Sequence, residues 1–157
     1  MRLEQPWKVA GRKIAPRPEI LDECLVAATD KLRVRTPLVV GGRSAGARSA
    51  ARTARTVGAS GCLGLAFPLH PPGKPEKLRD EHLYGLTLPM LFLQGSRDAF
   101  ALPGELEPVA GRIGGNAVVH RVADADHSFK VPRDQRSQEQ TGADLAAAVL
   151  EFIAGGP

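Results

Sequence analysis

The 157-residue chain has few cysteines, few aromatic residues and no long apolar run. Its two cysteines, Cys24 and Cys62, lie far apart in apolar segments, so we expect buried free thiols and no Cys/His metal site. One tryptophan and one tyrosine are too few for the alternation of basic and aromatic residues that single-stranded nucleic-acid binders use. No segment approaches the ~20 consecutive apolar residues of a transmembrane helix. We therefore expect no nucleic-acid partner, no membrane partner and no cofactor.

The composition is that of an ordinary globular protein with a basic balance. Apolar residues make up 43% of the chain, and this share and the length fit one domain over residues 1–157. The formal net charge is +4. Arg48, Arg52 and Arg55 are spaced to share one helix face, which we predict to be solvated. Residues 1–6 lack the apolar core of a signal peptide, so we expect a cytoplasmic protein.

The most informative segment is 36–46, where a short apolar run leads into the pattern G-x-S-x-G at Gly42–Gly46. By itself the pentapeptide fits a glycine-bearing turn with a solvated serine equally well. A strand before it and an alanine-rich helix after it favour a nucleophile elbow, the strained turn that exposes a serine hydroxyl. In this interpretation Ser44 is the nucleophile, and Gly42 and Gly46 supply the room for the turn.

The rest of the chain contains the two partners that such a serine needs. An elbow of this kind is followed along the chain by an acid and then by a histidine, each just past the end of a later strand. Asp98 follows the apolar run 89–95, and His127 follows the β-branched run 117–122. Chain order and strand ends therefore predict a triad of Ser44, Asp98 and His127.

Four segments of the chain resemble the α/β-hydrolase superfamily, and more narrowly its dienelactone-hydrolase-like branch, the KANL/TEX-type α/β-hydrolase-like domain. They are Gly41–Gly46, Phe67–Gly73, Leu93–Asp98 and Asp126–Phe129. The likeness runs from about Gln5 to the C-terminus. It implies that Ser44 is the nucleophile, Asp98 the acid and His127 the base.

Uninterrupted apolar strands that alternate with helices predict an α/β fold, a three-layer α/β/α sandwich around a mostly parallel sheet. Strands are expected at 38–40, 61–67, 90–94 and 117–122, with the end of another at 1–5, and helices at 18–32, from the elbow to about 57, 103–112 and 142–154, with a helical turn near 77–83. The front strands of an α/β-hydrolase sheet have no counterpart, so we expect an N-terminally shortened domain. Its exposed sheet edge would pair with a second copy or aggregate.

The expected activity is that of a serine hydrolase acting on a small ester, thioester or lactone through an acyl-enzyme. The backbone N–H of Ala45 would serve as one oxyanion donor. Trp7, Arg43 and His70 are candidate substrate contacts, although Trp7 serves equally as packing, Arg43 as a partner of a carboxylate in the fold, and His70 as a surface residue. The alternative is a catalytically weak or inactive α/β-hydrolase-like scaffold that acts as an interaction module.

Overall fold

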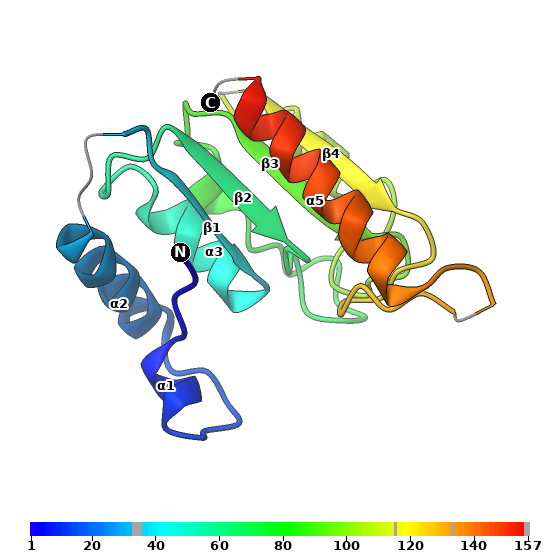
Figure 1. The fold of residues 1–157 in the computed structure, drawn as a ribbon, viewed down its shortest axis with the longest axis horizontal. Coiled ribbons are helices and arrows are strands. Elements are labelled where there is room, and N and C mark those ends of the chain that lie inside the picture. The colour runs from blue at the N-terminus through cyan, green and yellow to red at the C-terminus, as the bar shows by residue number, and fades with distance from the viewer. Residues whose placement is uncertain (33–35, 115, 133, 156–157) are drawn as a thin grey trace.

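The computed structural model describes residues 1–32, 36–114, 116–132 and 134–155. In this part of the chain four parallel strands form one sheet in the order β1-β2-β3-β4 (Figure 1). The strands are β1 (Val39–Arg43), β2 (Gly61–Leu65), β3 (Met90–Gly95) and β4 (Ala117–Val122). The helices are α1 (Pro6–Val9), α2 (Pro18–Lys31), α3 (Ala45–Thr53), the 3-10 helix η1 (Glu81–Leu83), α4 (Leu106–Ala110) and α5 (Gln138–Ala154).

Helices cover both faces of the sheet, so the predicted three-layer α/β/α architecture is confirmed. On one face Met90 and Phe92 of β3 lie in a buried cluster with the alanines of α3 and the apolar residues of α4. On the other face Leu91 and Leu93 lie in a second cluster, against which α5 packs. Figure 1 shows α5 lying across that face. Every residue of β3 is buried, which explains why this strand is a continuous apolar run in the sequence.

The helices depart from the expected ranges at their ends: α3 ends at Thr53 and not near residue 57, and α4 spans Leu106–Ala110 and not 103–112. α5 begins four residues earlier than expected because Ser137 and Gln140 form a capping box. The Ser137 hydroxyl accepts the Gln140 N–H at 3.1 Å, and the Gln140 side chain accepts the Ser137 N–H at 2.9 Å.

Among the described residues, no helix is both long and apolar enough to span a bilayer.

Two expectations about the N-terminal third are wrong. Residues 1–5 are not a strand; they lead directly into α1, and the Gln5 side chain donates to the Leu21 carbonyl of α2 at 3.5 Å. The arginine face of α3 is also not simply solvated, because α2 packs beside it. Arg52 makes a bidentate pair with Asp22 of α2, at 2.7 and 2.8 Å.

One edge of β1 has no neighbouring strand among the described residues. The Leu38 carbonyl accepts a hydrogen bond from the Ser60 N–H, and the Ser44 N–H donates to the Leu65 carbonyl. The backbone N–H and C=O groups of the even-numbered residues of β1 therefore point toward β2. The peptide groups of Val39, Gly41 and Arg43 therefore point outward. An edge of this kind is a template for pairing with another chain.

We accordingly expect the 157-residue chain to self-associate through β1 in a concentration-dependent way, as sedimentation velocity would measure. The substitution V39P removes an N–H that points away from the sheet, and an edge strand tolerates proline at such a position. It should therefore shift the distribution to monomer. V39A is the matched control, since it shortens the same side chain but keeps the N–H. A wild-type monomer at all concentrations, or equal association of V39P and V39A, would contradict this prediction.

Candidate active site

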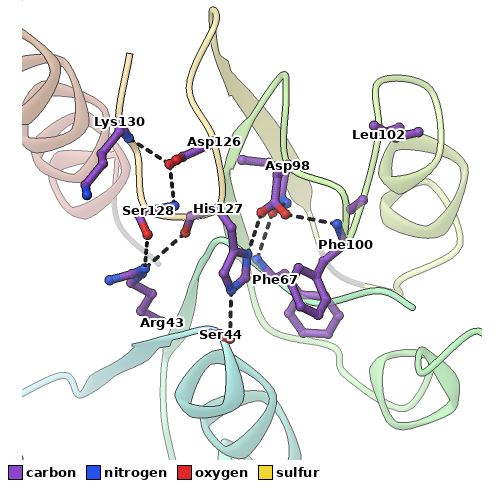
Figure 2. A network of polar contacts seen from close by, with 12 residues as sticks. Arg43, Ser44, Phe67, Asp98, Phe100, Leu102, Asp126, His127, Ser128 and Lys130 are labelled. Carbon is purple, nitrogen blue, oxygen red and sulfur yellow. Dashed lines mark hydrogen bonds and ion pairs between the residues drawn. The ribbon is translucent and has the colours of Figure 1, made fainter. Parts of the chain in front are cut away.

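Each residue of the predicted triad follows the carboxyl end of a different strand. Ser44 follows β1, Asp98 lies three residues after β3, and His127 lies five residues after β4. Because all the strands are parallel, their carboxyl ends meet at one edge of the sheet, where open α/β sheets bind ligands. Figure 2 shows the three side chains converging there from separate loops.

Ser44 sits in a strained turn between β1 and α3. Its φ of 53° and ψ of −118° lie in a region that non-glycine residues rarely occupy. The Ser44 N–H donates to the Leu65 carbonyl of β2 at 2.9 Å, and its carbonyl accepts the N–H of Ala47 at 3.0 Å. The turn is thus held from both sides, by the sheet and by the first turn of the helix.

The two glycines of the elbow differ in what the turn requires of them. A Cβ at Gly42 would lie 2.4 Å from the Gly46 carbonyl carbon, so no side chain fits there. A Cβ at Gly46 would meet no atom within 4 Å. The expectation that both glycines supply room holds for Gly42 and is wrong for Gly46.

A continuous series of hydrogen bonds joins the three side chains. His127 Nε2 lies 3.0 Å from Ser44 Oγ, and His127 Nδ1 lies 2.8 Å from Asp98 Oδ2 (Figure 2). Asp98 is fully buried, and as a carboxylate it can only accept hydrogen bonds. The proton of a neutral His127 therefore belongs on Nδ1, which leaves the Nε2 lone pair facing the serine hydroxyl.

Asp98 has further partners that hold its carboxylate in place. Oδ1 accepts the Phe100 N–H at 3.0 Å, and Oδ2 accepts the side-chain amide of Gln94 at 2.7 Å. The Phe100 ring lies against the His127 ring, with centroids 4.4 Å apart. Sequence reasoning missed Gln94. The available signal was its position, because it is a polar residue inside a strand that is otherwise apolar up to its closing glycine.

The loop that carries His127 is fixed by an acidic and a basic residue. Asp126 Oδ1 accepts the N–H groups of Ser128 and Lys130, at 2.7 and 2.9 Å. Burial opposes the charge of Asp126, but these two bonds outweigh it and lower the pKa of the carboxyl group. Arg43, next to the nucleophile, donates from Nη2 to the His127 carbonyl and to Ser128 Oγ, both at 3.1 Å (Figure 2). Its predicted substrate contact stays a prediction.

His70 does not line an open cleft, contrary to the expectation of a substrate contact or a surface residue. It is 2% exposed, and both ring nitrogens are occupied within the fold. Nδ1 lies 2.8 Å from the Pro71 carbonyl, and Nε2 lies 2.9 Å from Glu105 Oε2. Burial opposes the charged form, but the bonds to Glu105 and Pro71 outweigh it and raise the pKa of His70. The histidine therefore ties its loop to the segment before α4.

The remaining predicted site residues are placed as follows. Ala45 is the first residue of α3, so its N–H belongs to the first turn, whose donors lack intrahelical partners. Its role as an oxyanion donor remains a prediction. Trp7 lies in α1 and is half-buried, and its indole Nε1 has no hydrogen-bond partner among the described residues. Among the described residues, no group of three or more His, Cys, Asp or Glu side chains is placed to hold a metal ion.

A second histidine of the segment after β2 is partly enclosed. His82, in η1, stacks on Phe67, with ring centroids 6.0 Å apart. Burial, together with the nearby positive charges of Arg52 and Arg48, lowers the pKa of His82 to about 4. The segment after β2 thus packs onto the fold through His82 as well as through His70.

The structure is an α/β protein, a parallel sheet with helices on both faces. The hydrogen-bonded serine, histidine and aspartate beyond the ends of its strands form a hydrolase-like site. The family model described as an alpha/beta hydrolase domain matches residues 3–154. The chain belongs to the α/β-hydrolase family, which confirms the resemblance to that superfamily drawn from its sequence.

Solved structures share this fold at low sequence identity. The serine hydrolase XC6422 from Xanthomonas campestris, described as lidless, is 18% identical with a TM-score of 0.67, over 91% of this chain and 60% of that one. A thermophilic esterase from Thermogutta terrifontis is 17% identical with a TM-score of 0.68, over 90% and 74%. Est1E from Butyrivibrio proteoclasticus is 15% identical with a TM-score of 0.65, over 88% and 72%. The chain therefore spans 60% of the length of the Xanthomonas protein, and this likeness concerns the fold.

The geometry of the elbow predicts opposite outcomes for its two glycines. G42A should destabilise the protein by about 1–3 kcal/mol or more, because the added methyl group overlaps the backbone of Gly46. G46A is the matched control and should be tolerated, since alanine favours the helix by up to ~1 kcal/mol over glycine. Thermal unfolding followed by circular dichroism measures both. Equal melting temperatures for the two variants would refute this account of the turn.

The His70–Glu105 pair predicts a pH-dependent stability. The pKa of His70 is raised and that of Glu105 is lowered, in the latter case because the bonds to His70 and to the Leu102 N–H outweigh burial. The pair should therefore stabilise the fold fully between about pH 4.3 and 6.5, the ordinary values of the two groups. This contribution is lost as the pH rises through the folded-state pKa of His70 or falls through that of Glu105.

Denaturant unfolding at a series of pH values measures this contribution. H70N should cost about 1.5–3 kcal/mol within the window, the usual range for hydrogen bonds to charged groups, and less above it. E105Q keeps an acceptor but removes the charge, so it should lose the same pH dependence. A cost of H70N that does not change with pH would show that His70 is neutral in the fold.

Proposed function

We propose that this protein is a serine hydrolase that cleaves a small ester, thioester or lactone through an acyl-enzyme. The observation that carries the proposal is the hydrogen-bonded series from Ser44 Oγ through His127 to the buried Asp98 carboxylate. The strained conformation of Ser44 supports it, because such strain is kept where the surrounding structure holds a reactive group in position. The esterases among the solved structures of the same fold are consistent with this chemistry.

In the proposed reaction Ser44 Oγ attacks the substrate carbonyl carbon while His127 Nε2 takes the hydroxyl proton. Asp98 stabilises the imidazolium that forms. The same proton then goes to the leaving oxygen or sulfur, the acyl group stays on Ser44, and a water molecule activated by His127 releases it as the acid. The N–H of Ala45, at the start of α3, is the proposed donor to the oxyanion.

The substrate contacts are proposed from position. The Arg43 side chain is exposed and precedes the nucleophile, and only its Nη2 has a hydrogen-bond partner among the described residues. The other guanidinium nitrogens are therefore available to an acyl group that carries a negative charge. Trp7, half-buried in α1, remains a proposed wall of the substrate site.

The test uses a fluorophosphonate probe, which labels only an activated serine, together with hydrolysis of p-nitrophenyl acetate. S44A should abolish labelling and lower turnover by roughly 10⁶-fold relative to an active wild type. S49A is the matched control: Ser49 lies in α3, which follows Ser44, is fully buried and makes no side-chain hydrogen bond within the described residues, so its loss should leave labelling unchanged. An unlabelled wild-type protein would favour the non-catalytic scaffold, and undiminished turnover in S44A would move the chemistry elsewhere.

A further inference from the structure

A buried glutamine connects the acid of the site to a neighbouring loop. Gln94 is the penultimate residue of β3 and is fully buried. Its Oε1 accepts the backbone N–H of Phe67 at 2.7 Å, and its Nε2 donates to Asp98 Oδ2 at 2.7 Å. Both polar atoms of the amide are thus used within the fold.

The orientation of this amide is determined by the peptide group that it contacts. A backbone N–H can only donate, so Oε1 must face Phe67 and the NH₂ group must face Asp98. Phe67 is itself fixed, because its ring packs edge-on against Phe92, with centroids 5.4 Å apart, and stacks on His82. The donor that Asp98 receives is therefore held by a rigid anchor.

The Asp98 carboxylate depends on few donors. Oδ2 accepts from both Gln94 and His127, and Oδ1 accepts from the Phe100 N–H. No arginine or lysine within the described ranges contacts it, so Gln94 is the only side chain besides His127 that stabilises this buried charge. A buried carboxylate that loses a donor keeps its charge at a larger cost in free energy, and its orientation is less well defined.

We propose that Gln94 is a positioning residue of the active site, which aims Asp98 Oδ2 at His127 Nδ1. This inference rests on the proposed function, because it assigns Gln94 a role in the same triad. It also explains why a polar side chain, the amide of Gln94, lies in a buried strand whose other side chains are apolar. Glutamine offers one acceptor and one donor on opposite sides, which the Phe67 N–H and the Asp98 carboxylate require.

Two substitutions separate this role from simple packing. Q94M keeps a side chain of similar length but offers no comparable donor or acceptor. It should lower kcat by roughly 10- to 100-fold, the factor that corresponds to a hydrogen bond to a charged group. Its KM should change little, because Gln94 contacts the acid of the triad and not the proposed substrate contacts.

Q94E keeps the acceptor for Phe67, and so it remains informative if Q94M fails to fold. The introduced carboxyl group can donate to Asp98 only while it is protonated, and it loses that proton as the pH rises. The activity of Q94E should therefore fall with rising pH over a range in which the wild-type activity rises to a plateau. T53V is the matched control, since it removes another buried side-chain hydrogen bond, from Thr53 to the Ser49 carbonyl at 2.8 Å, and it should keep the wild-type profile.

Hydrolysis of p-nitrophenyl acetate across pH gives these profiles for the full chain. A Q94E profile that rises like the wild type, or a Q94M kcat equal to that of T53V, would overturn the role of Gln94. A wild-type protein without turnover would count against the proposed function alone. In that case the ¹⁵N spectrum of the His127 ring still decides: Q94M should lose the preference for the tautomer protonated on Nδ1, and a preference equal to that of T53V overturns the proposal.

Discussion

The burial of the Asp98 carboxylate is the constraint on which the rest of the site depends. A fully buried carboxylate must have its lone pairs satisfied by donors, and here the donors come from three separate segments. They are the amide of Gln94 in β3, the N–H of Phe100 in the following loop and the ring of His127 after β4. Satisfying one charge therefore joins three parts of the chain and directs His127 Nε2 toward Ser44.

The strained turn at Ser44 and the sheet around it support this arrangement from the other side. The positive φ of Ser44 is held by its hydrogen bond to Leu65 and by the close approach of Gly42 to the backbone of Gly46. Such strain costs of order 1–3 kcal/mol and persists only where surrounding contacts fix it. Arg43 then bridges the strand that carries the serine and the loop that carries His127. The backbone of the turn thus positions Ser44, the buried Asp98 carboxylate orients His127, and the two side chains contact each other.

The sequence predicted what depends on local order. Apolar runs gave the four strands, and the residues just past their ends, Ser44, Asp98 and His127, do lie in contact, although their catalytic roles remain predictions. It did not predict what depends on partners distant in the chain. The burial of His70 needs Glu105, and the role of Gln94 needs the Phe67 N–H, neither of which any spacing reveals. Residues 1–5 are predicted as the end of a strand, but no strand pairs with them in the described structure.

The most direct test of the central claim is the position of the proton on neutral His127. Two-bond ¹H–¹⁵N correlation spectra of the uniformly ¹⁵N-labelled protein distinguish the two tautomers of the imidazole ring. If the buried Asp98 carboxylate orients His127 toward Ser44, the proton resides on Nδ1 and Nε2 is bare. A ring that carries its proton on Nε2, or that exchanges evenly between both nitrogens, would contradict the account.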